Sequence, residues 1–191
     1  AMENPGKLAS EPIRTQRAEV LRALALIKKS DMQKQVARGQ YKGYADVKGV
    51  ASRSKTETYF KIEAHIGNDR WRGVPFFLES GKKMGERKTE VSVYFKKTES
   101  CLCPPEAEQH HQNVLTFRIQ PDEGISVLFW AKKPGFAVML EPKKMSFLYK
   151  QPEEETMLTD AYERVLFDCI RGDQTLFTST DEVLAAWKFI T

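Results

Sequence analysis

With 191 residues, of which 41% are hydrophobic, the chain is long enough to bury one substantial core, and a single domain over residues 1–191 is expected. The net charge of +4 comes from 30 basic and 26 acidic residues interspersed along most of the chain, which is modest beside a dedicated nucleic-acid binder. The chain has three cysteines without the spacing of a disulfide framework, which favours reduced thiols. It has no basic start followed by an apolar stretch, and no run near the roughly 18 apolar residues of a membrane span. These features favour a cytoplasmic protein over a secreted or membrane-spanning one.

The first part of the chain predicts one long helix between irregular segments. Residues 1–14 carry two prolines and no apolar period, which is typical of an irregular lead-in. From Thr15 to about Lys29 apolar residues recur at helical spacing and predict an amphipathic helix, at Val20, Leu21, Leu24 and Ile27. Residues 30–54 are polar and glycine-containing, so we expect mostly loop there, with one short strand at residues 36–41.

The middle of the chain is β-rich. Strands are predicted at residues 59–67, 74–79, 88–95, 113–120, 125–132 and 144–149. Alternation predicts that one face of two of these strands is buried, namely Val91, Val93 and Phe95 on the first and Leu115, Phe117 and Ile119 on the second. Short or polar connections favour antiparallel pairing, so the sequence predicts an α+β fold with a large, mostly antiparallel sheet and helices packed on one face.

Two helices are predicted at the end of the chain. The first runs from about Asp160 to Arg171, with Asp160 and Glu163 at capping-box spacing and Gly172 placed to terminate it. Its apolar stripe is predicted to be core, with Cys169 inert within it, and comprises Tyr162, Val165, Leu166, Cys169 and Ile170. The second begins after Thr180, and Leu184 and Trp187 are expected to anchor it.

A basic cluster follows the second predicted strand of the middle region. Lys82, Lys83, Arg87 and Lys88 surround a glycine-containing turn. Arginine offers a fixed fork of donors and lysine a mobile charge, which suits an anion or a sugar phosphate. A solvated basic turn remains the alternative at this point.

Arg118 and Gln120 form a second candidate site. Residues two apart on a strand share a face, and theirs is opposite the hydrophobic one, so both could reach a polar ligand on the sheet. Surface strands also carry such residues for solubility alone.

Metal and cofactor motifs are otherwise missing from the sequence. The cysteines and histidines of residues 101–111 match no tetrahedral zinc spacing, so no metal is expected at Cys101, Cys103, His110 or His111. His65 lies in the middle of a predicted strand, where a structural role is expected. The chain contains no G-x-G-x-x-G dinucleotide motif and no G-x-S-x-G nucleophile motif.

Several segments, taken in order, resemble the C-terminal domain of the glucose-6-phosphate dehydrogenase family. They are A-M-E-N-P at residues 1–5, R-G-Q-Y at 38–41, R-W-R-G-V-P-F at 70–76, G-K-K-M-G-E-R-K at 81–88, I-Q-P at 119–121, K-K-P-G at 132–135, D-A-Y-E-R at 160–164 and D-E-V-L-A-A-W at 181–187. Each match is short, and their common order along the whole chain carries the resemblance.

The resemblance implies the second part of an enzyme that oxidises glucose 6-phosphate to 6-phosphogluconolactone with NADP, in the oxidative pentose phosphate pathway. It implies a substrate-binding and dimerisation domain whose sheet meets its counterpart in a homodimer. The family's Rossmann domain, catalytic histidine and H-Y-L-G-K substrate segment are absent from these 191 residues, so the chain alone is expected to be inactive. A free-standing sugar-phosphate-binding or oligomerisation module is the alternative. A nucleic-acid-binding sheet is not favoured, because the sequence shows no exposed aromatic stacking platform.

The resemblance also assigns individual residues. Lys82 and Arg87 match the basic pair that contacts the sugar phosphate, and Gln120 matches a further substrate contact. Lys88 and Arg118 match part of the set that holds a second, structural NADP in certain members. Other positions of that set depart from the pattern, namely Glu79, Ser92, Leu128, Ser146 and Ser179, so no structural NADP is expected on this chain.

Overall fold

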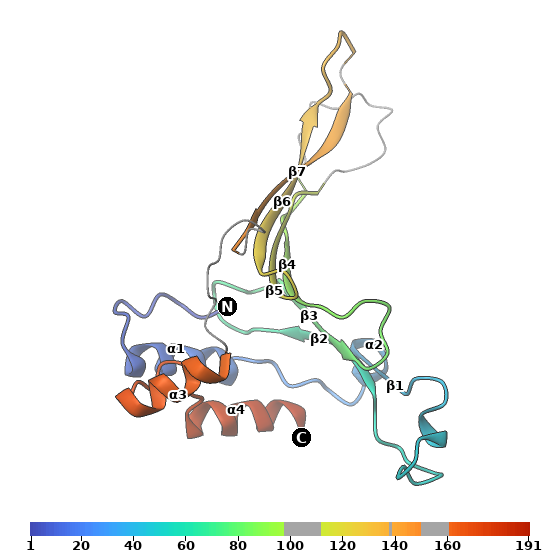
Figure 1. Ribbon diagram of the computed structural model, residues 1–191, viewed down its shortest axis with the longest axis vertical. Coiled ribbons are helices and arrows are strands. Elements are labelled where there is room, and N and C mark those ends of the chain that lie inside the picture. Colours follow the sequence, from blue (N-terminus) through green and yellow to red (C-terminus); the bar gives the residue numbers. More distant parts are fainter. Residues whose placement is uncertain (98–111, 138, 150–160) are drawn as a thin grey trace. The chain divides into compact units, whose positions relative to one another are not determined.

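The computed structural model describes residues 1–97, 112–137, 139–149 and 161–191 (Figure 1). The chain forms two compact units, and each is described by itself. The first comprises Ala1–Met84 and Thr159–Thr191, and the second comprises Gly85–Leu158.

The first unit combines a three-stranded sheet with helices. Its sheet has the order β1-β2-β3, with both pairings antiparallel. Its elements are α1 (Ser10–Arg22), α2 (Met32–Gln35), β1 (Val36–Gly39), a 3-10 turn η1 (Tyr44–Asp46), β2 (Tyr59–His65), β3 (Pro75–Gly81), α3 (Ala161–Arg171) and α4 (Thr180–Ile190). Helix α2 packs beside β1 and β2, and α1 packs along α4.

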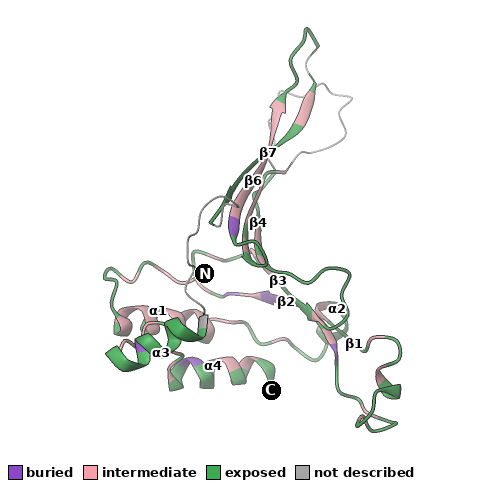
Figure 2. Ribbon diagram, viewed as in Figure 1, coloured by how far each residue is buried: buried purple, intermediate pink, exposed green. Residues whose placement is uncertain are grey.

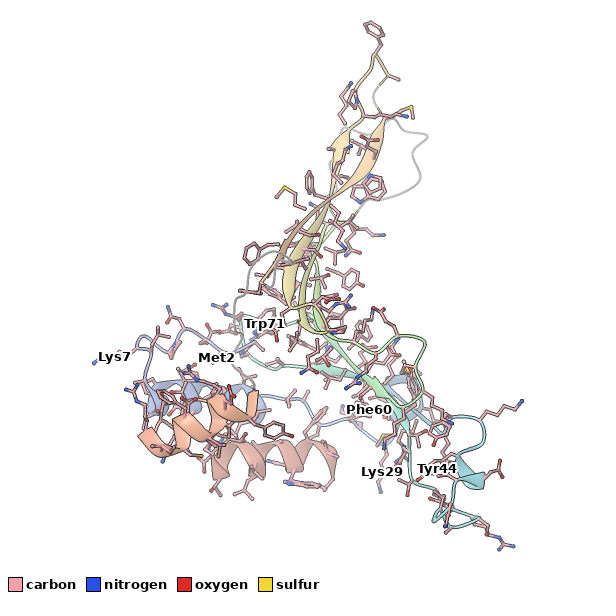
Figure 3. The ribbon with its side chains drawn as sticks, in the orientation of Figure 1. Met2, Lys7, Lys29, Tyr44, Phe60 and Trp71 are labelled. Atoms are coloured by element: carbon pink, nitrogen blue, oxygen red, sulfur yellow. The ribbon has the colours of Figure 1, made fainter. Side chains whose placement is uncertain are left out.

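The N-terminal lead-in is irregular up to Ala9, and it is attached to the unit through the segment that precedes β3. Trp71 donates its indole N–H to the carbonyl of Ala1 at 2.6 Å, and Arg70 Nε donates to both carboxylate oxygens of Glu3 at 2.9 Å. Figure 3 shows the Trp71 side chain beside Met2. The first residues of the chain are therefore part of the folded unit.

Helix α1 begins and ends earlier than the sequence predicts. It starts at Ser10 because Pro12 lies in the first turn, where a missing N–H leaves no helical hydrogen bond unmade. It ends at Arg22 because the following backbone pairs with the sheet instead. Leu24 forms an antiparallel bridge with Ile66, and Ala25 N–H donates to the carbonyl of His65 at 2.9 Å.

A buried carboxylate joins α1 to α4. Glu182 is 3% exposed, and Arg17 Nε lies 2.8 Å from its Oε1. Glu182 also completes a capping box with Ser179, an arrangement that typically contributes about 1 kcal/mol. Burial acts to raise the pKa of Glu182, but the Ser179 hydrogen bonds and the Arg17 charge outweigh it, so the pKa lies below its ordinary value. The start of α4 is therefore fixed by the cap that Ser179 and Glu182 form.

The second unit is a four-stranded antiparallel meander. Its strands are β4 (Thr89–Tyr94), β5 (Val114–Gln120), β6 (Gly124–Lys132) and β7 (Leu140–Leu148), in the order β4-β5-β6-β7. The α+β class and the antiparallel pairing predicted from the sequence are confirmed, with the strands divided between two sheets.

The register of the second sheet separates an apolar face from a polar one. The apolar face is formed by Val91, Val93, Leu115, Phe117, Ile125, Val127, Met145 and Phe147, which lie opposite one another across the four strands. On the other face Ser92 pairs with Thr116, their hydroxyl oxygens 3.2 Å apart, and Glu90 lies opposite Arg118. The predicted separation of faces is therefore present in the pairing.

Burial corrects several predictions (Figure 2). Val91, Phe117 and Ile119 were expected to be buried, yet each is exposed, because nothing in the described part of the second unit covers the apolar face. The stripe of α3 was expected to be core, but Cys169 is exposed and Ile170 is 86% exposed, because the side that α3 buries is the one that carries Asp168, which is 2% exposed.

Two further expectations concern the last helices. Leu184 and Trp187 were predicted to anchor α4, but both are exposed, because the side of the helix that faces α1 is the one that carries Glu182. Gly172 does end α3, with a φ of +68° that favours glycine. The predicted capping residue Asp160 lies outside the described residues.

Candidate functional site

The turn after β3 carries the first two cations of the predicted cluster. Lys82 N–H donates to the carbonyl of Thr58 at 2.8 Å, which ties the turn to the start of β2. Lys83 has a φ of +55°, which is uncommon for a residue other than glycine. Its Nζ lies 4.3 Å from the centre of the Tyr41 ring, within the range of a cation–π interaction. The charge of Lys83 is therefore held against an aromatic ring of its own chain.

Gly81 gives this turn the room that it needs. A Cβ at Gly81 would lie 2.8 Å from Met84 Sδ and 2.9 Å from a ring carbon of Tyr59, closer than real Cβ contacts. The Tyr59 hydroxyl donates to Glu79 at 2.9 Å, and this hydrogen bond raises the pKa of Tyr59. Gly81, the residue before Lys82, is thus enclosed by Met84 and by the Tyr59 ring, which the hydrogen bond to Glu79 holds in place.

The next cations lie at the start of β4, in the second unit, within a network that we call the charge quartet: Glu86, Lys88, Glu90 and Arg118. Lys88 Nζ lies 2.9 Å from Glu90 and 3.3 Å from Glu86. Arg118 lies 3.2 Å from Glu90 and 3.3 Å from Glu86. Each cation therefore contacts both carboxylates, and the quartet has no net charge.

The contacts within the quartet shift the pKa values of Glu86 and Lys88. The hydrogen bond from Lys88 holds the pKa of Glu86 below its ordinary value, with a smaller contribution from Arg118. The hydrogen bonds to Glu90 and then Glu86 raise the pKa of Lys88. Both shifts favour the charged forms, so the contacts stabilise the carboxylate of Glu86 and the ammonium of Lys88.

Lys82, Arg87 and Gln120 are exposed and differ from their neighbours in having no such contacts. Within the described ranges, no ion pair, cation–π contact or side-chain hydrogen bond involves these three side chains. Gln120 lies opposite Thr89, at a bulge at the start of β4. Thr89 in turn is two residues from Arg87 along the chain. Lys82 belongs to the first unit, whereas Arg87 and Gln120 belong to the second. The basic cluster of the sequence is thus divided into two paired and two unpaired cations.

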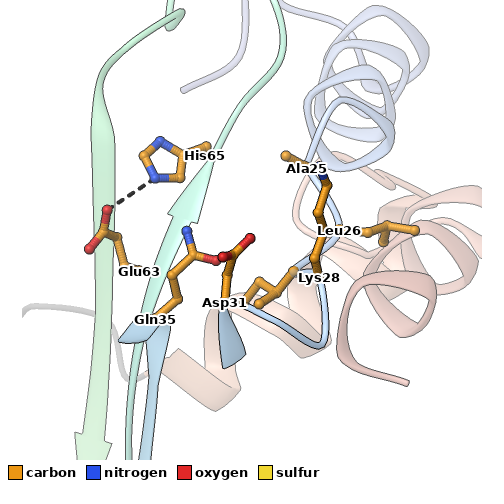
Figure 4. A pocket seen from close by; sticks show the side chains of 8 residues that line it. Ala25, Leu26, Lys28, Asp31, Gln35, Glu63 and His65 are labelled. Carbon is orange, nitrogen blue, oxygen red and sulfur yellow. Dashed lines mark hydrogen bonds and ion pairs between the residues drawn. The ribbon is translucent and has the colours of Figure 1, made fainter. Parts of the chain in front are cut away.

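A shallow hollow of about 110 Å³ lies elsewhere in the first unit, between residues 25–35 and β2 (Figure 4). His65 Nε2 lies 3.1 Å from Glu63 Oε1 at its edge, and Asp31 and Gln35 also line it. Pockets for small ligands usually measure about 300–1,000 Å³, so the hollow is small for a sugar phosphate. The contact with Glu63 supports the structural role predicted for His65.

Metal ligands do not gather in the described residues, where no group of three or more histidine, cysteine, aspartate or glutamate side chains could hold an ion. The predicted absence of a metal at Cys101, Cys103, His110 and His111 concerns residues outside the described ranges. Among the helices that are described, none is long and apolar enough to cross a membrane.

Comparison with known proteins identifies the family. Residues 1–191 match the family model for the glucose-6-phosphate dehydrogenase C-terminal domain. The chain belongs to this family. It is 40% identical to glucose-6-phosphate 1-dehydrogenase of Chlamydia trachomatis, over 98% of the chain and 44% of the relative, and 38% identical to that of Bacillus subtilis, over 100% of the chain and 41% of the relative.

Solved structures of the family agree with the fold. A glucose-6-phosphate dehydrogenase in complex with its substrate glucose 6-phosphate matches with a TM-score of 0.87 and 31% identity, over 100% of this chain and 40% of that one. The Mycobacterium avium enzyme matches with a TM-score of 0.82 and 30% identity, over 99% of this chain and 39% of that one. The chain therefore spans about two fifths of the length of the relatives that it matches.

Sequence reasoning did not find the residues that hold the cations. Glu86 and Glu90 stand two residues either side of Lys88, so their pairing with Lys88 had a local signal in the sequence spacing. Tyr41 and Thr58 had none, because they are far from Lys82 and Lys83 in sequence and meet them only through the sheet.

Proposed function

We propose that this chain is the substrate-orienting part of a dehydrogenase that oxidises glucose 6-phosphate to 6-phosphogluconolactone, with NADP as the coenzyme. The observation that carries the proposal is the family match over the entire chain, together with the relative whose solved structure contains glucose 6-phosphate. The unpaired state of Lys82 and Arg87 supports the same role, because a cation without an internal partner is available to an anionic ligand.

In this proposal each residue takes its role from the family resemblance: Lys82 and Arg87 contact the sugar phosphate, and Gln120 makes a further substrate contact. The guanidinium fork fixes the direction of the phosphate, and the ammonium adds a mobile charge. Their effect is positional: with the phosphate held at one end, the C1 hydrogen at the other end is directed towards the nicotinamide. Such orientation can lower a barrier by several kcal/mol. The hydride acceptor NADP and the histidine base would belong to a Rossmann part of the enzyme, so the chain alone would be inactive.

The proposal includes a homodimer that forms through the four-stranded sheet. Its apolar face carries Phe117, Phe147 and Met145, which are 39%, 54% and 62% exposed. An apolar surface that extends over four strands is typical of an interface, since isolated domains rarely expose one. The proposal also includes a cytoplasmic location and a role in the pentose phosphate pathway, for which the family membership is the support.

The test requires two proteins: this chain by itself, and a complete enzyme, by which we mean a polypeptide in which this chain follows a coenzyme-binding part. We expect the complete enzyme to reduce NADP when glucose 6-phosphate is added, and the chain alone to produce no NADPH. Activity of the chain alone would contradict the proposed division of labour. A folded complete enzyme that ignores glucose 6-phosphate would contradict the substrate.

A further inference from the structure

Adjacent lysines in the turn after β3 differ in what surrounds them. Lys83 places its Nζ over the Tyr41 ring, 4.3 Å from the centre, whereas the Lys82 side chain contacts no polar or aromatic partner in the part of the chain that is described. Two neighbouring flexible cations could otherwise both reach the same phosphate. The contact with the Tyr41 ring engages one of them.

Tyr41 is itself held firmly. Its backbone N–H donates to Thr58 Oγ1 at 2.9 Å, and its ring packs edge-to-face against Tyr44 with centroids 5.4 Å apart. Gln40 closes the loop that follows, because its side-chain amide donates to the carbonyls of Ser54 and Thr56 at 2.8 and 2.9 Å. The ring therefore has a defined position against which Lys83 can be fixed.

Thr58 connects Tyr41 to Lys82 directly. It is 8% exposed, and its three backbone and side-chain groups are all used: its N–H donates to Gly39, its hydroxyl accepts from Tyr41, and its carbonyl accepts from Lys82. The Lys82 backbone is thus held at one point by Thr58, and the next residue is held by the Tyr41 ring. Lys83 lies in the left-handed region, which is unfavourable for a residue other than glycine, and both contacts help to hold the turn in this conformation.

We propose that Tyr41 is a positioning residue for substrate: by binding the Lys83 ammonium, its ring fixes the turn in the form that presents Lys82 to the phosphate. This inference rests on the proposed function. Lys83, although part of the basic cluster, then acts on the substrate only through the turn that it shares with Lys82.

The test uses four variants of the complete enzyme. Tyr41→Leu removes the ring, Tyr41→Phe keeps it, Lys83→Met removes the cation, and the double variant Tyr41→Leu/Lys83→Met removes both. Cation–π contacts at partly exposed sites correspond to changes of about three- to fivefold in binding. We expect Tyr41→Leu and Lys83→Met each to raise KM for glucose 6-phosphate by about that factor with kcat changed less than about twofold, Tyr41→Phe to match wild type, and the double variant to equal a single one.

The outcomes separate this inference from the function on which it rests. An unchanged KM in Lys83→Met, whose exposed side chain can be removed without threatening the fold, would overturn the inference even if Tyr41→Leu failed to fold. So would additive effects in the double variant, because Tyr41 would then act by another route. Lys82→Met serves as the reference: if it too leaves KM unchanged, the proposed phosphate site is wrong, whereas a raised KM in Lys82→Met alone defeats only the role of Tyr41.

Discussion

Lys83 and Lys88 are held by groups of their own chain, whereas Lys82 and Arg87 contact no such group among the described residues. All four lie within one short basic segment, and by composition they are equivalent. The structure distinguishes them by what lies opposite: a tyrosine ring for Lys83, two glutamates for Lys88, and solvent for the other two. A basic cluster in a sequence therefore gives only the largest number of cations that a binding site could use, since some of them contact groups of their own chain.

The charge quartet also explains why a second coenzyme site is not expected here. An anionic ligand at Lys88 or Arg118 would have to displace Glu86 and Glu90, each of which contacts both cations. The chain thus supplies internally the negative charge that a bound phosphate would otherwise provide. This argument is independent of the departures at Glu79, Ser92, Leu128, Ser146 and Ser179.

The largest expected effect comes from removing an unpaired cation. Arg87→Ala in the complete enzyme should raise KM for glucose 6-phosphate more than about tenfold, because a charge-assisted bidentate contact is lost. Steady-state kinetics measure the effect, and Lys88→Met is the matched control, with an expected change below about twofold. Similar values for the two variants would remove the distinction between paired and unpaired cations.

A smaller effect is expected when Lys88 and Arg118 lose the glutamates that pair with them. The double variant Glu86→Gln/Glu90→Gln leaves Lys88 and Arg118 without counter-charges, so polyanions should bind more tightly. A pair of charges in contact in water is worth about 1 kcal/mol, which corresponds to roughly fivefold in the dissociation constant of tripolyphosphate. Calorimetry on the variant and on wild type measures this difference. Equal affinities would mean that the glutamates do not neutralise the cations.

The pH dependence of stability should show a modest contribution from the quartet. Because the pKa of Glu86 in the folded chain is below its ordinary value of 4.5, its stabilising contribution is complete above pH 4.5 and is lost as the pH falls through the folded value. For exposed pairs the loss should amount to about 1–2 °C in Tm. Thermal melts of wild type and Glu86→Gln between pH 3 and 7 test this, and the two curves should converge at the acid end.

The last prediction is that no binding of NADP to this chain is measured. Titration of NADP into this chain should release no heat attributable to binding, since the cations of the quartet are already neutralised. Dissociation in the micromolar range would show that NADP displaces the glutamates, and it would remove the contrast with Lys82 and Arg87.

The local sequence pattern predicted much of the secondary structure. Strand alternation located β2 to β6 within a few residues, and glycine spacing located the end of α3. The start of α1 was misplaced because Pro12 was interpreted as part of an irregular segment, although the first turn of a helix accepts proline. Burial was predicted poorly. Periodicity shows which side chains share a face, but it does not show whether anything covers that face, as the exposed Ile119 and Trp187 demonstrate.

The sequence by itself determined the family, the α+β class and the set of basic residues from which a phosphate site could be built. Only the tertiary structure decided which of those residues are already occupied. Lys83 meets Tyr41, and Arg118 meets Glu86, although the two residues of each pair are distant in sequence. The physical reason is that a charge is neutralised by whatever lies within a few ångströms of it, and strand pairing sets that distance where sequence spacing does not.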